Sequence, residues 1–175
     1  MDKKEALKQI KAGDLSLADA DDKEAKRKKS LGELGELFGI KALVDNKFEK
    51  IVNLNDIKMN YPFADLYAEK DGKKYVISIK ARNKNQKNGT LNSRYKLGSN
   101  AYSHASRAEE KFDAEAYWMA VQFDEETVSI YFGSLAELNQ SNGIPMKKCE
   151  SGTVGECLVK DKSHYFDFSY FDNKE

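Results

Sequence analysis

An acidic residue and a lysine face each other across a predicted β-hairpin. Residues 65–82 read DLYAEKDGKKYVISIKAR, with two β-prone runs separated by an Asp-Gly turn. Successive strand residues point to opposite faces, so Ser78 and Lys80 share one face, and the turn brings Asp65 back beside them. Metal-assisted phosphodiester cleavage requires such a pair, since a carboxylate holds a hard cation and a lysine neutralises charge on the phosphate. Ser78 stands where such a site usually has a second carboxylate.

Strands and helices must position these residues. The pattern predicts strands over 48–54, 64–69, 75–81, 116–123 and 127–132, a helix over 99–112, a short helix or turn at 134–139 and a last strand at 165–170. The 99–112 helix has Ala101, Ala105 and Ala108 on its close-packing face. Residues 83–96 are expected to form a polar loop. This order predicts an α/β sandwich with a mixed central β-sheet flanked by helices.

A helix capped by Ser30 and running to about Leu43 is expected before the first strand. Its apolar stripe has Glu33 and Glu36 toward one side. Three glycines, at positions 32, 35 and 39, weaken this helix, and small residues at this spacing indicate that another element packs close to its backbone. Residues 2–29 are expected to add one or two short amphipathic helices.

The order and spacing of these residues resemble the PD-(D/E)xK nuclease superfamily, whose restriction-endonuclease-like fold has an αβββαβ core. Members present an acid on one strand and Glu-x-Lys or Asp-x-Lys on the next; here these positions are Asp65 and Ser78-Ile79-Lys80, a Ser-x-Lys variant. Many members add a glutamate from the first core helix within Gly-x-x-Gly-Glu. Residues 32–36, GELGE, fit that pattern, with Glu36 as the candidate and Glu33 as the fallback. The resemblance covers residues 30–135.

The resemblance implies catalytic roles for Lys80, Asp65 and Glu36. Asp65, Glu36 and the backbone carbonyl of Ile79 would bind Mg²⁺ or Mn²⁺. Some superfamily members with Ser-x-Lys bring a glutamate from a following helix, a role that Glu109 or Glu110 on the 99–112 helix could fill here. The structural alternative for Asp65 and Lys80 is a cross-strand ion pair.

A basic run follows the lysine. Residues 72–108 carry nine basic groups and no acid, although the whole chain has 29 basic and 29 acidic residues. We expect the loop to contact the nucleic-acid backbone through Arg82, Lys84, Lys87, Arg94 and Lys96. A solvated basic loop is the alternative.

Three nearby side chains have two interpretations each. Tyr95 and Tyr102 could stack on bases, although aromatic residues near a sheet more often belong to the core. His104 could contact phosphate or assist proton transfer, and a packed or surface histidine is the simpler interpretation.

The bulk properties predict a soluble, cytoplasmic protein of 175 residues. No apolar run is long enough to span a membrane. Cys149 and Cys157 provide no disulfide framework, and their spacing with His164 matches no common zinc pattern. We divide the chain into an N-terminal helical extension (1–29), a nuclease-like core (30–140) and a C-terminal, largely irregular extension (141–175).

The sequence therefore predicts a metal-dependent endonuclease that hydrolyses DNA phosphodiester bonds, with RNA as a substrate and a homodimer left open. A nuclease-fold module that binds nucleic acid without cutting it is the alternative. A third hypothesis is an interaction domain whose basic loop meets an acidic partner.

Overall fold

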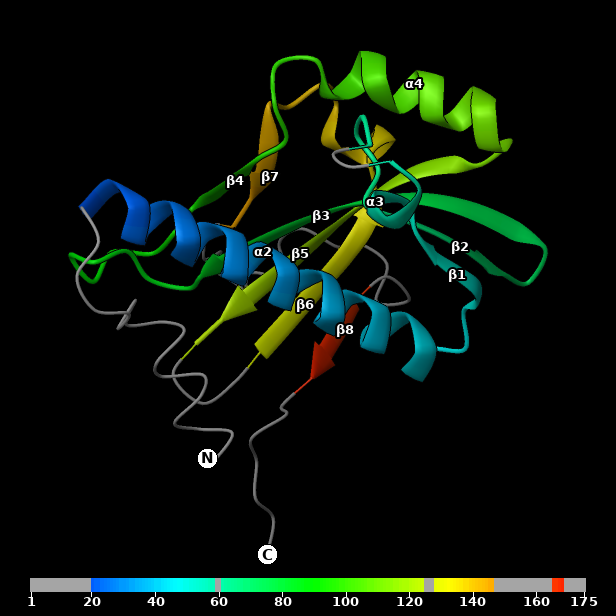
Figure 1. Cartoon of the computed structure of the whole chain (residues 1–175). Helices are drawn as coiled ribbons and strands as arrows, with labels where there is room; N and C mark the ends of the chain where they lie inside the picture. The colour runs from blue at the N-terminus through cyan, green and yellow to red at the C-terminus, as the bar shows by residue number, and fades with distance from the viewer. Residues whose placement is uncertain (1–19, 59–60, 125–127, 147–164, 169–175) are drawn as a thin grey trace, which may run out of the picture.

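The computed structural model describes residues 20–58, 61–124, 128–146 and 165–168. Its elements are α2 (Ala20–Asp45), β1 (Glu49–Asn53), α3 (Leu54–Ile57), β2 (Leu66–Lys70), β3 (Lys73–Asn83), β4 (Arg94–Lys96), α4 (Ala101–Phe112), β5 (Glu115–Phe123), β6 (Val128–Ser134), the short 3-10 helix η1 (Ala136–Leu138), β7 (Gly143–Pro145) and β8 (Tyr165–Phe168) (Figure 1). A six-stranded sheet has the order β1-β2-β3-β5-β6-β8. In it β3 and β5 are parallel, and the other neighbouring pairs are antiparallel.

The predicted fold class is confirmed. The chain passes through α2, β1, β2, β3, α4 and β5 in the αβββαβ order, and β6 and β8 extend the mixed sheet. The helix α4 is the crossover that joins the parallel strands β3 and β5, as a parallel pair requires.

The β2–β3 hairpin has the register that its turn sequence dictates. Asp71 and Gly72 both have positive φ, 50° and 77°, as a two-residue type I′ turn demands. Lys70 consequently pairs with Lys73, and Leu66 pairs with Ile77 at the other end. Since β3 continues to residue 83, its second half extends beyond β2 and leaves an edge that β2 does not cover.

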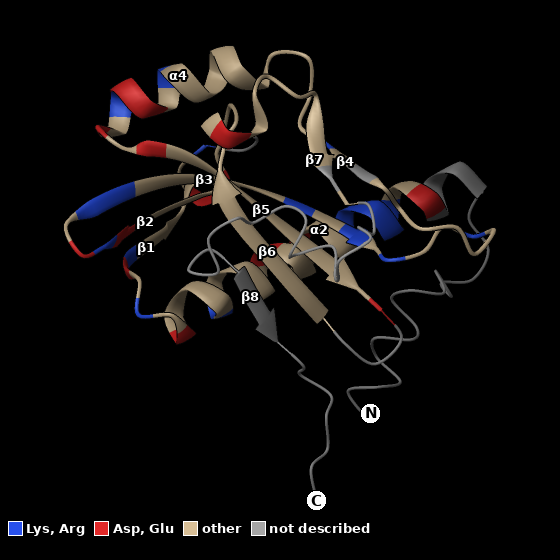
Figure 2. Ribbon diagram, turned by 180° about the vertical axis from the view of Figure 1, so that it is seen from behind, with Lys and Arg blue, Asp and Glu red and all other residues tan. Residues whose placement is uncertain are grey.

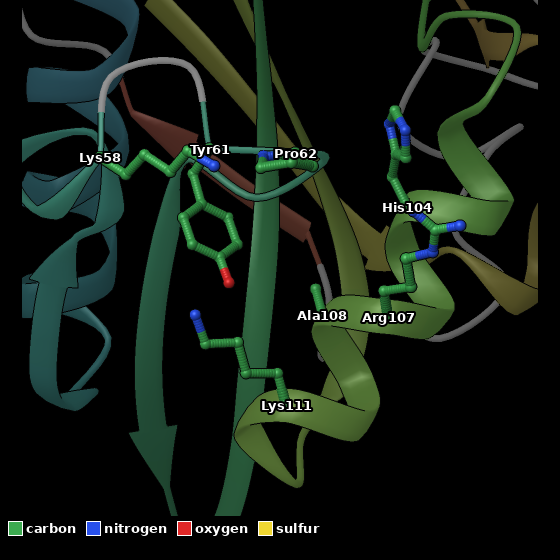
Figure 3. Close-up of a pocket in the computed structure, with 7 residues that line it drawn as sticks. All are labelled: Lys58, Tyr61, Pro62, His104, Arg107, Ala108 and Lys111. Atoms are coloured by element: carbon green, nitrogen blue, oxygen red, sulfur yellow. The ribbon is translucent and has the colours of Figure 1, made fainter.

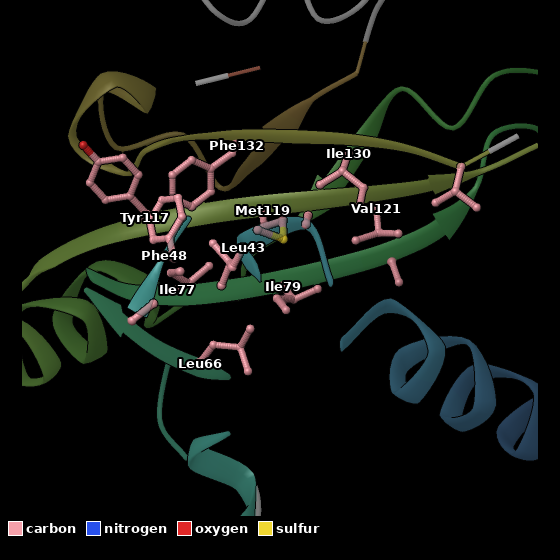
Figure 4. Close-up of a cluster of buried hydrophobic side chains, with 14 of the residues drawn as sticks. Leu43, Phe48, Leu66, Ile77, Ile79, Tyr117, Met119, Val121, Ile130 and Phe132 are labelled. Atoms are coloured by element: carbon pink, nitrogen blue, oxygen red, sulfur yellow. The ribbon is translucent and has the colours of Figure 1, made fainter. Parts of the chain in front are cut away.

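The two faces of β3 belong to different clusters of buried side chains. Ile77 and Ile79 point toward α2, where they join Leu43, Met119 and Phe132 in the larger cluster (Figure 4). On the other face, Val76 packs against the predicted alanine face of α4, which is buried at Ala101, Ala105 and Ala108. Ser78 and Lys80 therefore lie on the α4 side of the sheet.

Two glycines hold α2 close to β3. A Cβ on Gly35 would collide with the Cβ of Ala81, and one on Gly39 would lie 2.7 Å from the Cδ1 of Ile79. The predicted close packing is confirmed at these positions, whereas Gly32 has open space around it. This approach fixes the distance between β3 and the intervening residue, Glu36.

Three local predictions were wrong. Ser30 does not cap a helix, because α2 already begins at Ala20; residues 20–29 are rich in helix formers, and Lys28 pairs with Glu24 at 3.1 Å. The expected polar loop contains β4, which pairs with β7. Residues 143–145 are consequently not irregular. The predicted last strand is confirmed as β8, against β6.

Other predictions fall on residues outside the described part. These are the helices expected within residues 1–19, and Cys149, Cys157 and His164. Among the described residues, no helix is both long and apolar enough to cross a membrane.

Candidate active site

Asp65 directly precedes β2, and its side chain bonds to the edge of β3 that β2 leaves uncovered. Its backbone N–H donates to Ile77 O at 2.8 Å, so Asp65 is the last residue before the strands separate. Its Oδ2 then accepts a hydrogen bond of 2.6 Å from the backbone N–H of Ile79. A carboxylate thus takes the place that a strand carbonyl would occupy. Because the N–H and C=O of a strand residue point to the same edge, the carbonyl of Ile79 also faces this side.

Glu36 reaches the same edge from α2. Its two carboxylate oxygens accept hydrogen bonds from the side-chain amides of Asn53, at 3.4 Å, and Asn55, at 3.2 Å. Asn53 also caps α3, because its Oδ1 accepts from the Asn55 backbone N–H at 2.9 Å. The short helix α3 therefore orients both amides toward Glu36.

Both carboxyl groups have raised pKa values. Burial is the main cause for Asp65, and the Lys80 ammonium, the Ile79 N–H and the side chains of Asn55 and Ser78 oppose it. Although part of the Asp65 residue is exposed, its carboxyl group is removed from most of the solvent. For Glu36 the causes are burial and then the nearby Asp65 carboxylate, opposed by the two asparagine amides. The two acids are therefore close enough to repel each other.

Lys80 acts on Asp65 without forming a contact ion pair. None of the ion pairs found among the described residues includes Lys80, yet its charge favours the ionised form of Asp65. The side chain is partly exposed. The cross-strand ion pair considered as the alternative is thus absent, and the ammonium group is available to another anion.

Ser78 is buried in the sheet beside Trp118 of β5, with 1% of its surface exposed. Neither of the glutamates expected on α4 replaces the missing carboxylate. Glu109 is held at the start of β5, where its Oε1 accepts from the Ala116 N–H at 2.9 Å, and Glu110 is exposed on α4. The fallback Glu33 is exposed on α2 beside Lys29, at 3.9 Å.

The donor set suits a hard cation with few protein ligands. No group of three or more His, Cys, Asp or Glu side chains with metal-binding geometry occurs within the residues that the structure describes. Glu36 and Asp65 are two oxygen donors, the charge of Asp65 raises the pKa of Glu36, and the Ile79 carbonyl faces the same edge. Mg²⁺ commonly binds through one or two carboxylates and completes its shell with water and phosphate. The residues present fit that pattern.

Comparison with known proteins finds a structural likeness and no sequence match. No protein-family profile matches the sequence, and no curated protein matches it at a significant level. Among solved structures it is similar to Hjc, a Holliday junction resolvase from the archaeal hyperthermophile Archaeoglobus fulgidus. That likeness covers 62% of this chain and 79% of Hjc, with 18% identity and a TM-score of 0.44. The assignment of the site rests on its own geometry.

The residues predicted to bind the nucleic-acid backbone differ in their surroundings. Arg82 and Lys96 are exposed. Figure 2 marks the basic positions along the ribbon in blue. Lys87 lies 3.8 Å from Glu24, and Lys84 forms an ion pair of 2.7 Å with Asp124. Arg94 is in β4, and its side chain is outside the described part.

The two tyrosines are structural residues. Tyr95 is fully buried under the β4–β7 ribbon with Trp118 and Ile144. Tyr102 is partly buried and donates its hydroxyl to Ser141 O at 3.1 Å. The core interpretation is confirmed for Tyr95, whose ring has no exposed face. Tyr102 packs against the second buried cluster and keeps part of its surface exposed.

Asn53 and Asn55 are site residues that sequence reasoning missed. The Asn-Leu-Asn-Asp run at residues 53–56 is a helix-cap signal that could have predicted α3. The contacts with Glu36 could not have been predicted, because Asn53 and Asn55 lie 17 and 19 residues from it and meet it only through the path of the chain from α2 to α3.

Proposed function

We propose that this protein is a Mg²⁺- or Mn²⁺-dependent endonuclease that hydrolyses DNA phosphodiester bonds. The observation that carries the proposal is the convergence of Glu36 and Asp65 at the uncovered edge of β3. The charge of Lys80 acts on Asp65, and Lys80 belongs to none of the ion pairs in the described part of the chain. This is the arrangement that the resemblance to the PD-(D/E)xK superfamily implies.

The residues take distinct roles in the proposed reaction. Glu36, Asp65 and the Ile79 carbonyl would hold the cation, which supplies a polarised phosphate and a water of lowered pKa. Asn53 and Asn55 fix the Glu36 carboxylate before substrate arrives. Lys80 neutralises the charge that builds on the phosphate as a water oxygen bonds to phosphorus and the bond to the leaving oxygen breaks.

The basic residues after β3 supply the substrate surface. Arg82, Lys87 and Lys96 lie on or after the strand that carries Lys80, and with Arg94 and Lys84 they would neutralise backbone phosphates. Lys84 would do so only by exchanging its present partner, Asp124.

Ser78 favours a second candidate function, a module that binds DNA without cutting it. The buried hydroxyl leaves two carboxylates at the edge, and the glutamate that could have replaced the third bonds to Ala116 instead. Such a module would bind DNA with the same salt dependence and would show no cleavage with any divalent cation.

A cleavage assay separates these functions. The purified chain is incubated with linear duplex, four-way junction and single-stranded DNA, and with RNA of the same sequences, in Mg²⁺, Mn²⁺ or Ca²⁺. We expect cutting of DNA in Mg²⁺ or Mn²⁺. Salt-dependent binding without cutting supports the module, and absence of binding supports neither.

A further inference from the structure

A basic cavity of about 240 Å³ lies between α4 and the chain that leads from α3 to β2 (Figure 3). We call it the basic pocket and define it by Lys58, Tyr61, His104, Arg107 and Lys111. The last three of these residues lie on α4 at positions i, i+3 and i+7, so they form one stripe along the helix. Lys58 and Tyr61 form the facing wall.

Its charge is not compensated within the described residues. Lys58, Arg107 and Lys111 are exposed, and none of them belongs to an ion pair in that part of the chain. No acidic side chain lines the cavity. Three cations around one cavity repel one another, and an anion between them would remove that repulsion.

The aromatic wall helps to hold one of these cations. The Nζ of Lys111 lies 5.0 Å from the centre of the Tyr61 ring, within the range of a cation–π interaction. Tyr61 and His104 are themselves partly buried, so the pocket lining combines partly buried rings with exposed charges. The cavity volume exceeds that of several waters at about 30 Å³ each, so the cavity is large enough for a phosphate group.

The pocket is close to the candidate active site. Pro62, on its wall, precedes Asp65 by three residues, which span at most about 11 Å. The pocket lies on the α4 side of the sheet, where Ala64 packs with Val76 and Ala108, and Asp65 directly follows Ala64 in the chain. One strand of nucleic acid advances about 3.4 Å per nucleotide, so a few nucleotides join the two places.

We propose that the basic pocket binds a backbone phosphate of the nucleic-acid substrate, a few nucleotides from the scissile bond. This inference rests on the proposed function and names a second contact for the same substrate. Arg107 and Lys111 bind the phosphate oxygens from α4, and Lys58 closes the pocket from the other wall.

The first test uses inorganic phosphate and needs no DNA. Phosphate is titrated into the full chain while the imidazole NMR signals are followed, with chloride at equal ionic strength as the control and His104→Asn to assign the signal. We expect phosphate to shift the His104 signal saturably, and this shift to be lost in Arg107→Gln/Lys111→Gln. Equal shifts with phosphate and chloride would overturn the proposal.

The second test uses a short DNA duplex without divalent cation. The double variant should reduce the slope of log binding constant against log salt by about 2, because two phosphate contacts are removed. Lys47→Gln/Lys70→Gln, with two cations removed elsewhere, should leave the slope unchanged, and circular dichroism checks that all variants fold. A slope unchanged in the pocket variant, despite its lost phosphate shift, would mean binding of free anions only and would overturn the nucleic-acid assignment. Absence of cleavage would overturn the endonuclease and leave both measurements standing.

Discussion

The backbone N–H of Ile79 donates a 2.6 Å hydrogen bond to Asp65 Oδ2, at the edge of β3 that β2 leaves uncovered. The bond fixes one oxygen of the carboxylate against the strand that carries Lys80. With Glu36 held by two asparagine amides on the other side, the site brings two acids together before any cation binds. The protein pays for this arrangement in stability, and that cost can be measured.

Replacing Asp65 by asparagine should stabilise the metal-free protein. The raised pKa of Asp65 means that folding favours the protonated form of its carboxyl group. The stability that this group contributes is fully present below the usual aspartate pKa, and it is lost as the pH rises through the raised pKa of the folded protein. Asp65→Asn can still accept the hydrogen bond from the Ile79 N–H, so it should have a higher Tm than wild type at pH 7.5. The difference in Tm between the two proteins should be smaller at pH 4. Each kcal/mol regained raises Tm by about 2–4 °C.

Added cation should reverse that order. Mn²⁺ at 100 times its Kd should stabilise the wild type by about 2.7 kcal/mol and leave Asp65→Asn unchanged. Asp71→Asn, in the exposed turn of the same hairpin, is the matched control and should respond like wild type. Equal stabilisation of Asp65→Asn by Mn²⁺ would place the cation elsewhere.

Asn55→Ala should weaken cation binding without removing a ligand. The Asn55 amide donates to Glu36 Oε1 at 3.2 Å and also opposes the rise in the pKa of Asp65. Its loss therefore leaves Glu36 with the Asn53 amide alone and disfavours the ionisation of Asp65. Loss of a partner that orients a ligand typically costs 10–100-fold in metal affinity. Calorimetric titration with Mn²⁺ measures the Kd, and Asn142→Ala, at an exposed position, is the control. An unchanged Kd would show that Glu36 does not need the amide.

Ser78→Asp should supply the carboxylate that the site lacks. Because Ser78 is buried, the new charge should lower the Tm of the metal-free protein, at a cost of about 1–3 kcal/mol or more. Mn²⁺ should recover more stability in this variant than in wild type, since a third ligand raises the affinity. Thermal unfolding with and without Mn²⁺ tests both effects. A loss of stability that the cation does not repair would mean that the position faces away from it.

The hairpin could be predicted from sequence because local rules dictate it. The Asp-Gly turn sets the register, and the alternation of β3 then places Ser78 and Lys80 on one face. The glycines of α2 indicated close packing, which the structure confirms at Gly35 and Gly39.

Contacts between distant segments could not be predicted in this way. The β4–β7 ribbon joins two strands of three residues each, and Arg94 pairs with Pro145 far along the chain. Pairing of these strands buries Tyr95. From the sequence, stacking of this tyrosine on a base was an open alternative. The same limit applies to Asn53 and Asn55, whose partner lies on α2.

Cations beyond the active site should account for the salt dependence of DNA binding. Arg82→Gln/Lys96→Gln removes two exposed charges and should reduce the slope of log binding constant against log salt by about 2. Lys47→Gln/Lys70→Gln is again the control. Fluorescence anisotropy over a range of salt concentrations measures the slope. Equal slopes for the two double variants would show that Arg82 and Lys96 do not contact DNA.

Single-turnover cleavage tests whether Asp65 and Lys80 catalyse cation-dependent cutting of DNA. Wild type, Asp65→Asn and Lys80→Met are each bound in excess to labelled DNA without divalent cation, and Mn²⁺ is then added. We predict that wild type cuts only after the addition, that Asp65→Asn binds the DNA and does not cut, and that Lys80→Met cuts about 10²–10³-fold more slowly. Cutting by Asp65→Asn at the wild-type rate, or by DNA-bound wild type with no divalent cation, would contradict the proposed roles of Asp65 and the cation.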